Sequence, residues 1–149
     1  MARNAVASVL VLDVGSGMCA SPSFRVAKEA VSHLSQQKLL FAPKDDVGVV
    51  LCGSKATCNS CVVSGDYQHI SVIREVLPCS VDLLQAVLQV NNEVGGCAGD
   101  LLDALVVAID LLVDKYIGKA KKKHVFVITD AADPIRSARD VDVIVQSQL

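Results

Sequence analysis

The chain has 149 residues, of which 52% are hydrophobic, 20% are charged and only 3% are aromatic. This length suits one domain, since domains typically run to roughly 100 to 200 residues, and the composition requires an aliphatic core. The apolar runs are far shorter than the ~18 residues of a membrane-spanning helix, so we expect no membrane partner. With 14 basic and 16 acidic residues, a net charge of −2, the chain lacks the broad electropositive face that binds nucleic acid phosphates.

Apolar runs bounded by turn residues alternate with longer helical patterns, which is typical of β-α-β units around a largely parallel sheet. The first predicted strand, AVASVLVLD, ends at Asp13. Ser21 and Pro22 then supply an N-cap and a first-turn proline for a helix that runs to about Phe41.

Two further strands are predicted next, DDVGVVLCG and HISVIREV. The segment between them, residues 54–68, is rich in serine, glycine and aspartate and has no helical pattern. Because a parallel pair needs a long crossover, we expect these two strands to be antiparallel neighbours.

Two helices follow the third strand. Ser80 is the predicted N-cap of a helix through Val94, and Asp100 begins another, DLLDALVVAIDLLVDKYIG, which Gly118 ends. Asp103 stands at the third helical position, where a carboxylate meets the positive end of the helix dipole.

HVFVITD, ending at Asp130, predicts a fourth strand, and DVDVIVQSQL at residues 140–149 predicts a further helix or strand. The predicted fold is a doubly wound, mostly parallel α/β sheet with helices on both faces. A four-stranded sheet of this kind leaves a hydrophobic strand edge unpaired. We therefore expect residues 1–149 to be one domain of a longer protein, incomplete at its C-terminus and without its last strands.

The loop after the first strand, DVGSGMCA, has two competing interpretations. Its glycines fit G-x-G-x-x-A, a pyrophosphate-binding loop, but the following helix is predicted to start only at Ser21 and no acidic residue ends the second strand. Asp13 would also repel phosphates. No G-x-x-x-x-G-K-[ST] motif occurs either, so neither a dinucleotide nor an ATP cofactor is indicated.

The alternative interpretation is a divalent metal loop of the von Willebrand A type, D-x-S-x-S. Asp13 and Asp130 stand at the tips of their strands, where such ligands converge. Gly15 and Gly17 occupy the hydroxyl positions, and Gly99 or Asp100 stands where a threonine is expected. With two carboxylates left, we predict a vestigial loop that binds no metal tightly and serves the fold, each aspartate accepting amide hydrogen bonds.

The six cysteines favour a reducing compartment, because four of them lie in or beside apolar runs where free cysteine acts as a small hydrophobe. Cys58 and Cys61 form one C-x-x-C, the half-site of a zinc ribbon or a redox pair. No second C-x-x-C exists, so a surface loop with two free thiols is favoured over zinc or redox function.

A basic run, KAKKKH, contains Lys119, Lys121, Lys122 and Lys123. These lysines are candidates for a peripheral contact with DNA or a partner protein. The alternative, which we favour, is a solvated helix C-terminus, where lysines complement the dipole by about 0.3 to 1 kcal/mol.

Five stretches, VLVLDVGSGM, KDDVGVVLCGS, YQHISVIREV, GDLLDALVVAIDLL and HVFVITDAADP, together resemble the N-terminal von Willebrand A-type domain of the large subunit of Ku, the DNA-end-binding heterodimer. The resemblance extends over essentially the whole chain in order. GDLLDALVVAIDLL and YQHISVIREV are its most specific parts.

This resemblance implies a non-catalytic, nuclear subunit that acts in non-homologous end joining and telomere maintenance. Its implied partners are the smaller Ku subunit, DNA ends bound through the complete complex, and end-joining and telomere factors. In this family the A-type domain is a docking platform, and the DNA ring is formed elsewhere in the chain. The family is sometimes labelled an ATP-dependent helicase subunit, although no nucleotide-hydrolysing motif is present here. The alternative is a metal-dependent A-type adhesion or scaffold domain.

Overall fold

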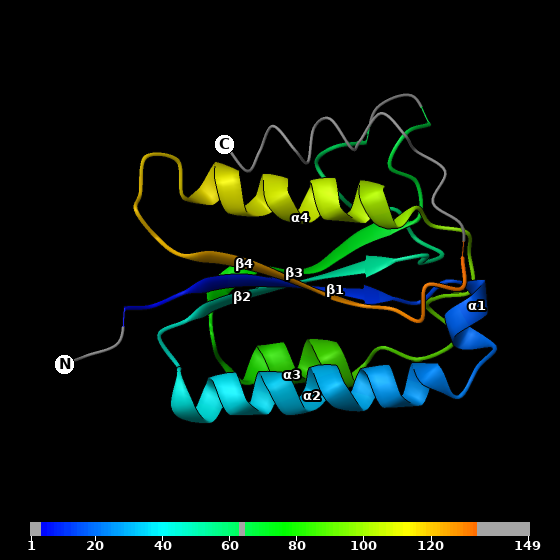
Figure 1. Cartoon of the computed structure of the whole chain (residues 1–149), viewed down its shortest axis with the longest axis horizontal. Helices are drawn as coiled ribbons and strands as arrows, with labels where there is room; N and C mark the ends of the chain where they lie inside the picture. Colours follow the sequence, from blue (N-terminus) through cyan, green and yellow to red (C-terminus); the bar gives the residue numbers. More distant parts are fainter. Residues whose placement is uncertain (1–3, 63–64, 134–149) are drawn as a thin grey trace.

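The first predicted strand, β1 (Ala7–Asp13), lies inside the sheet, and each of its residues is buried. A parallel strand covered by helices on both faces must be apolar throughout, and this explains the continuous run of aliphatic residues. The computed structural model describes residues 4–62 and 65–133. In this part of the chain, four strands form one sheet in the order β3-β2-β1-β4 (Figure 1).

The pairing of the strands confirms the mixed sheet. β2 (Asp46–Cys52) and β4 (Lys123–Ile128) flank β1 and run parallel to it. β3 (Ile70–Pro78) is antiparallel to β2, as we predicted from the lack of a helical pattern between the two strands. The carboxyl ends of β1, β2 and β4 therefore meet at one edge, where an α/β sheet carries its ligand sites.

Helices cover both faces of the sheet (Figure 1). α2 (Ser23–Phe41) and α3 (Val81–Leu88) pack on one face, and α4 (Leu101–Lys115) packs on the other. Each face has its own aliphatic core, so the predicted doubly wound architecture is confirmed. Among the described residues, no helix is long and apolar enough to cross a membrane.

The structure corrects the sequence prediction at two helices. A short helix, α1 (Ser16–Cys19), begins inside the glycine loop, where none was predicted. α3 ends at Leu88 and not at Val94, because the chain turns there to bury Val90 in the core. The loop after α3 then bonds to its surroundings, with the Val94 carbonyl accepting from the Lys55 amide at 2.8 Å.

The helix caps differ in how closely they follow prediction. The Asp100 carboxylate caps α4 by accepting from the Leu102 amide at 2.9 Å. Pro22 and not Ser21 is the N-cap residue of α2, and the Ser21 hydroxyl accepts from the Ser23 amide. Gly118 has a φ of 69°, the left-handed conformation expected after a helix, although α4 itself ends at Lys115. The element predicted at residues 140–149 lies outside the described residues.

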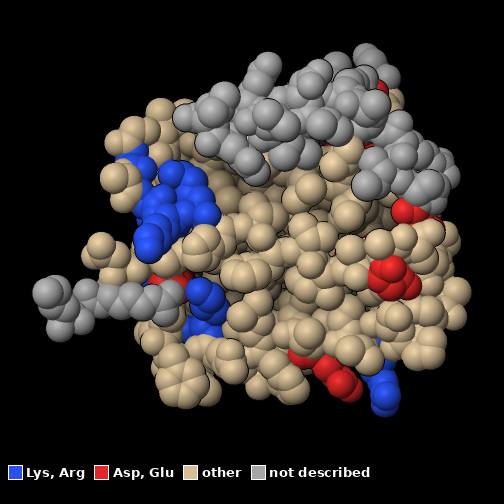
Figure 2. Space-filling view, viewed as in Figure 1, with Lys and Arg blue, Asp and Glu red and all other residues tan. Residues whose placement is uncertain are grey.

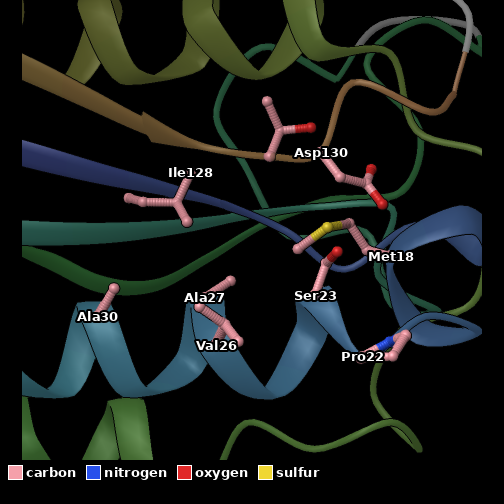
Figure 3. A pocket seen from close by; sticks show the side chains of 9 residues that line it. Met18, Pro22, Ser23, Val26, Ala27, Ala30, Ile128 and Asp130 are labelled. Carbon is pink, nitrogen blue, oxygen red and sulfur yellow. The ribbon is translucent and has the colours of Figure 1, made fainter.

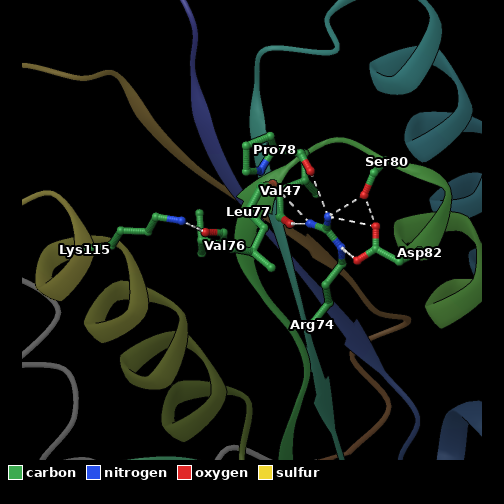
Figure 4. Close-up of polar contacts among 8 residues, drawn as sticks. All are labelled: Val47, Arg74, Val76, Leu77, Pro78, Ser80, Asp82 and Lys115. Carbon is green, nitrogen blue, oxygen red and sulfur yellow. Dashed lines mark hydrogen bonds and ion pairs between the residues drawn. The ribbon is translucent and has the colours of Figure 1, made fainter.

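Arg74 in β3 is buried against an irregularity in the sheet. The register between β2 and β3 shifts on both sides of Val49, and the guanidinium donates to the carbonyls of Val47, Leu77 and Pro78 (Figure 4). It also bonds both carboxylate oxygens of Asp82 at the start of α3. One side chain therefore links the irregular strand pair to a helix.

β4 lies at an edge of the sheet, and among the described residues no strand pairs with its outer side. Phe126 and Val127 in this strand are 37% and 38% exposed. An apolar strand with a free hydrogen-bonding edge is a template for self-association.

We therefore expect the 149-residue chain to be marginally stable and to self-associate at high concentration. Val127→Lys should reduce this association, because a charge beside the open edge opposes strand pairing. Size-exclusion chromatography with light scattering would measure it, with Val81→Lys, an equally drastic change at an exposed valine of α3, as the control. A cooperative melt of a monomeric wild-type chain would contradict the expectation.

Candidate functional site at the strand tips

Asp13, the last residue of β1, is fully engaged by its own surroundings. Its buried carboxylate accepts from the Gly15 amide at 2.8 Å and from the Thr129 hydroxyl at 2.6 Å, one bond to each oxygen. These two bonds fix the loop after β1 and tie it to the end of β4. The bond from the Gly15 amide is of the kind that we predicted for Asp13.

Three glycines from three loops pack backbone against backbone beside Asp13. A Cβ atom on Gly99 would lie 2.8 Å from the Cα of Gly53, and one on Gly53 would lie 2.6 Å from the Cα of Gly15. Real Cβ atoms essentially never come this close to other heavy atoms. The space in which three loops of a metal site would present side chains is therefore filled by main chain.

Asp133 reaches the same loop from the segment after β4. A Cβ atom on Gly15 would overlap its carboxylate, and one on Gly17 would lie 3.2 Å from its Oδ1. A serine at either glycine position would therefore require Asp133 to move. Sequence reasoning missed Asp133; the only signal was its place three residues after Asp130 in TDAAD.

A pocket of about 290 Å³ lies next to this glycine contact and is lined by Asp13, Cys52, Thr129 and Asp133 among others. The carboxylates of Asp13 and Asp133 and the hydroxyl of Thr129 make its lining acidic. Burial, followed by the charge of Asp13, raises the pKa of the Cys52 thiol, so the sulfur stays protonated and is no nucleophile at neutral pH. Within residues 4–62 and 65–133, no group of three or more histidine, cysteine, aspartate or glutamate side chains is arranged to hold a metal ion.

Asp130 is placed on a different flank of the domain. Its carboxylate accepts from the Ala132 amide at 3.1 Å, the amide hydrogen bond that we predicted for it. It also lines a groove of about 380 Å³ between α2 and the end of β4, together with Met18, Val26 and Ile128 (Figure 3). The structure thus brings Asp13, Gly15, Gly17 and Gly99 together around Asp133 and leaves Asp130 outside this group.

The structure also argues against a pyrophosphate site in the glycine loop, for one reason that was predicted, the charge of Asp13, and one that was not, the carboxylate of Asp133. A helix does begin inside the loop, but α1 has only four residues. The Gly15 amide is used by Asp13, and the Asp133 carboxylate lies against Gly15 and Gly17. A phosphate here would meet two negative charges.

Titration with Mg²⁺ or Mn²⁺ should show no binding tighter than about millimolar, because the pocket offers few oxygen ligands and Asp13 is already bonded twice. Isothermal titration calorimetry measures this directly, with Asp13→Ala as the comparison. Tighter binding that disappears in the variant would show that the loop is a working metal site.

The candidate lysines separate into two groups. Lys121 is structural: its ammonium bonds Asp46 at 2.7 Å and lies 4.8 Å from the centre of the Tyr116 ring. Lys119, Lys122 and Lys123 have exposed side chains. In Figure 2, most of the visible lysine and arginine side chains lie on the left side of the molecule, and another lies at its lower right. The sequence run could not distinguish the part-buried ion pair of Lys121 from the exposed lysines.

Cys58 and Cys61 lie on the surface loop between β2 and β3. Cys58 is exposed, and Cys61 is half-buried, with its amide donating to the Asn59 side chain at 3.0 Å. Burial raises the pKa of the Cys61 thiol, and the charge of Asp110 raises it further. A raised thiol pKa suits a free cysteine better than a reactive redox pair.

This sheet order, with helices on both faces and a loop of aspartate and glycines at the tip of β1, defines a von Willebrand A-type α/β domain. A von Willebrand factor type A structure from Catenulispora acidiphila matches 99% of this chain and 31% of its own, with a TM-score of 0.68 and 16% identity. The proximal thread matrix protein 1 of the mussel byssus matches 97% of this chain and 35% of its own, with a TM-score of 0.63 and 14% identity.

The sequence then identifies the family. Residues 7–149 match the family described as the Ku70/Ku80 N-terminal alpha/beta domain, and the chain belongs to this family. It is 35% identical to "X-ray repair cross-complementing protein 5" of Dictyostelium discoideum, over 93% of this chain and 18% of that protein. It is 38% identical to "ATP-dependent DNA helicase 2 subunit KU80" of Arabidopsis thaliana, over 96% of this chain and 21% of that protein. The chain thus spans about a fifth of the length of these relatives, and the predicted resemblance is confirmed.

Proposed function

We propose that this chain is a non-catalytic protein-interaction domain of a nuclear Ku subunit that acts in double-strand break repair by non-homologous end joining and in telomere maintenance. The family match over residues 7–149 and the Ku80-type relatives support the repair role. The smaller Ku subunit, DNA ends held by the complete heterodimer, and end-joining and telomere factors are the proposed partners.

The observation that carries the non-catalytic part of the proposal is the contact of Gly15, Gly53 and Gly99 at the strand tips. Ligand sites of α/β sheets are built at this edge, and here main chain and two acidic side chains occupy it. We therefore propose that binding takes place on the outer surfaces of the helices and loops. We expect no saturable binding of ATP or NAD, which equilibrium dialysis would measure.

The heterodimer can be tested by co-purification. Expressed from its complete reading frame with an affinity tag, the protein should retain the co-expressed smaller Ku subunit through a wash at physiological salt. An A-type domain of similar fold but another family, such as the Catenulispora domain, should retain none when it carries the same tag. Equal retention by the two baits, or none by this protein, would reject the proposal.

A second candidate function is a metal-dependent adhesion or scaffold domain. Its support is the acidic pocket, where Asp13, Asp133 and the Thr129 hydroxyl lie around one cavity. The titration with Mg²⁺ and Mn²⁺ described above separates the two functions, because only this second one requires a bound cation.

A further inference from the structure

The basic turn, which we define as residues 116–123, joins α4 to β4 and is closed by backbone hydrogen bonds. The Lys119 amide donates to the Tyr116 carbonyl at 3.0 Å, and the Lys121 amide donates to the Lys119 carbonyl at 2.9 Å. The Lys122 carbonyl accepts from the Ala7 amide, which ties the turn to β1. A fixed backbone lowers the entropic cost of binding, so these lysines are better suited to recognition than a frayed helix end.

Among the described residues, Asp46 forms an ion pair with Lys121 and with none of the other lysines of the basic turn. Both Lys121 and the Tyr116 hydroxyl donate to the Asp46 carboxylate. Burial would raise the pKa of Asp46, but the hydrogen bonds from Lys121 and Tyr116 outweigh it and hold the pKa below its ordinary value. Asp46 therefore stays ionised and keeps its ion pair with Lys121. In the described part of the chain, no ion pair involves Lys119, Lys122 or Lys123.

Apolar side chains stand beside these cations. Ile117 is 71% exposed, and Val113, four residues earlier on α4, is also exposed. Val113 lies in the last turn of α4, and Ile117 lies in the turn that follows the helix, two residues before Lys119. These two exposed aliphatic side chains make up the apolar strip of this surface. An apolar strip bordered by charge is the usual composition of a small protein interface.

The combination favours a peptide over a nucleic acid. The chain has a net charge of −2, and Asp13, Asp100 and Asp133 lie near the carboxyl ends of the strands, away from the basic turn, so the domain lacks a broad positive face for a duplex. Duplex binding draws on many phosphate contacts, and aliphatic side chains add nothing to them. A segment with carboxylates and aliphatic side chains complements both parts of the surface.

We propose that the basic turn docks an acidic, partly apolar peptide segment of a partner protein, with Lys119, Lys122 and Lys123 meeting its carboxylates and Ile117 and Val113 meeting its aliphatic side chains. This deepens the proposed role as an interaction domain and rests on it. The surface lies at the amino-terminal end of β4, and the acidic pocket lies at the other end of the strands.

The test uses the full 149-residue chain tethered at low density on a sensor, so that copies cannot self-associate. The probe is a peptide of alternating glutamate and leucine. Lys119→Glu with Lys122→Glu should weaken its binding roughly tenfold, because two attractive pairs become repulsive. Arg25→Glu with Lys55→Glu makes the same charge change at exposed positions elsewhere and should alter binding less than about twofold.

Three further measurements separate the alternatives. Ile117→Ser should weaken the glutamate-leucine peptide several-fold but leave polyglutamate of equal length unaffected. Tighter binding of a blunt DNA duplex than of the peptide, no peptide binding at all, or equal losses in the two charge-reversal variants would each overturn the proposal. Because this assay contains no second Ku subunit, its failure is distinct from a failure of co-purification.

Discussion

Replacing Gly99 by threonine, the residue that a metal-binding A-type loop would carry there, should lower the free energy of unfolding by about 3 kcal/mol or more. The new Cβ would lie 2.8 Å from the Cα of Gly53 and closer still to its nitrogen. Both atoms are main chain, so a rotamer change cannot relieve the overlap. The loops after β1 and β2 would have to separate, and the Thr129 to Asp13 hydrogen bond at that edge would be strained.

Two matched variants separate steric overlap from backbone strain. Gly96 has a φ of 92° and open space around it, so Gly96→Ala should cost only about 1 kcal/mol, the ordinary penalty for a left-handed alanine. Gly53→Ala combines a φ of 91° with overlap and should be the most destabilising alanine variant. Urea denaturation followed by circular dichroism measures all of them. If Gly99→Ala unfolds at the same urea concentration as wild type, the backbone contact is not as close as described.

The glycine contact also shows where sequence reasoning about the site stops. Sequence alone identified Asp13 and the missing hydroxyls at Gly15, Gly17 and Gly99, because a motif lists residue types at fixed spacing. It could not show that Gly53, in a loop of no recognised motif, fills the space between them. It also named Asp130 and missed Asp133, since which of the two aspartates turns towards Asp13 depends on the path of the loop after β4.

The fold was more predictable, and its exceptions have physical causes. Four strands and the antiparallel pairing of β2 with β3 followed from apolar runs and from the lack of a crossover helix. α1 was missed because four residues are too few to show helical periodicity. α3 was predicted too long because Val90 and Val94 continue an apolar pattern, although tertiary packing of Val90 ends the helix.

Replacing Arg74 by methionine should lower the free energy of unfolding by about 2 kcal/mol, because the buried Val47 carbonyl loses its donor, while the part-buried carbonyls of Leu77 and Pro78 can bond to water instead. Its guanidinium donates to three carbonyls, of Val47, Leu77 and Pro78, and its side chain is only 4% exposed (Figure 4). The register shift beside Val49 leaves the Val47 carbonyl in need of a donor from outside the strand ladder. Methionine fills the volume but supplies none.

Two control variants separate the contribution of the carbonyl hydrogen bonds from that of the Arg74–Asp82 ion pair. Arg74→Lys keeps the charge but has three donors on one nitrogen, which cannot reproduce the five-donor fork, so its cost should be intermediate. Asp82→Asn should cost well under 1 kcal/mol, because the Asp82 side chain is 54% exposed and an exposed ion pair contributes little. If Asp82→Asn were as damaging as Arg74→Met, the ion pair and not the carbonyls would be the source of the stability.

The pH dependence of stability provides an independent test of the same contact. The hydrogen bond from Arg74 lowers the pKa of Asp82 below its ordinary value of 3.8. A carboxyl with a lowered folded-state pKa contributes stability that is fully present above pH 3.8 and is lost as the pH falls through the lowered pKa. Wild type should therefore lose part of its advantage over Arg74→Met below about pH 4, while the carbonyl contribution, which does not titrate, persists. The Asp82 pKa itself, measured by NMR titration, should rise in Arg74→Met and stay low in Arg74→Lys, because only lysine keeps a cation beside the carboxylate.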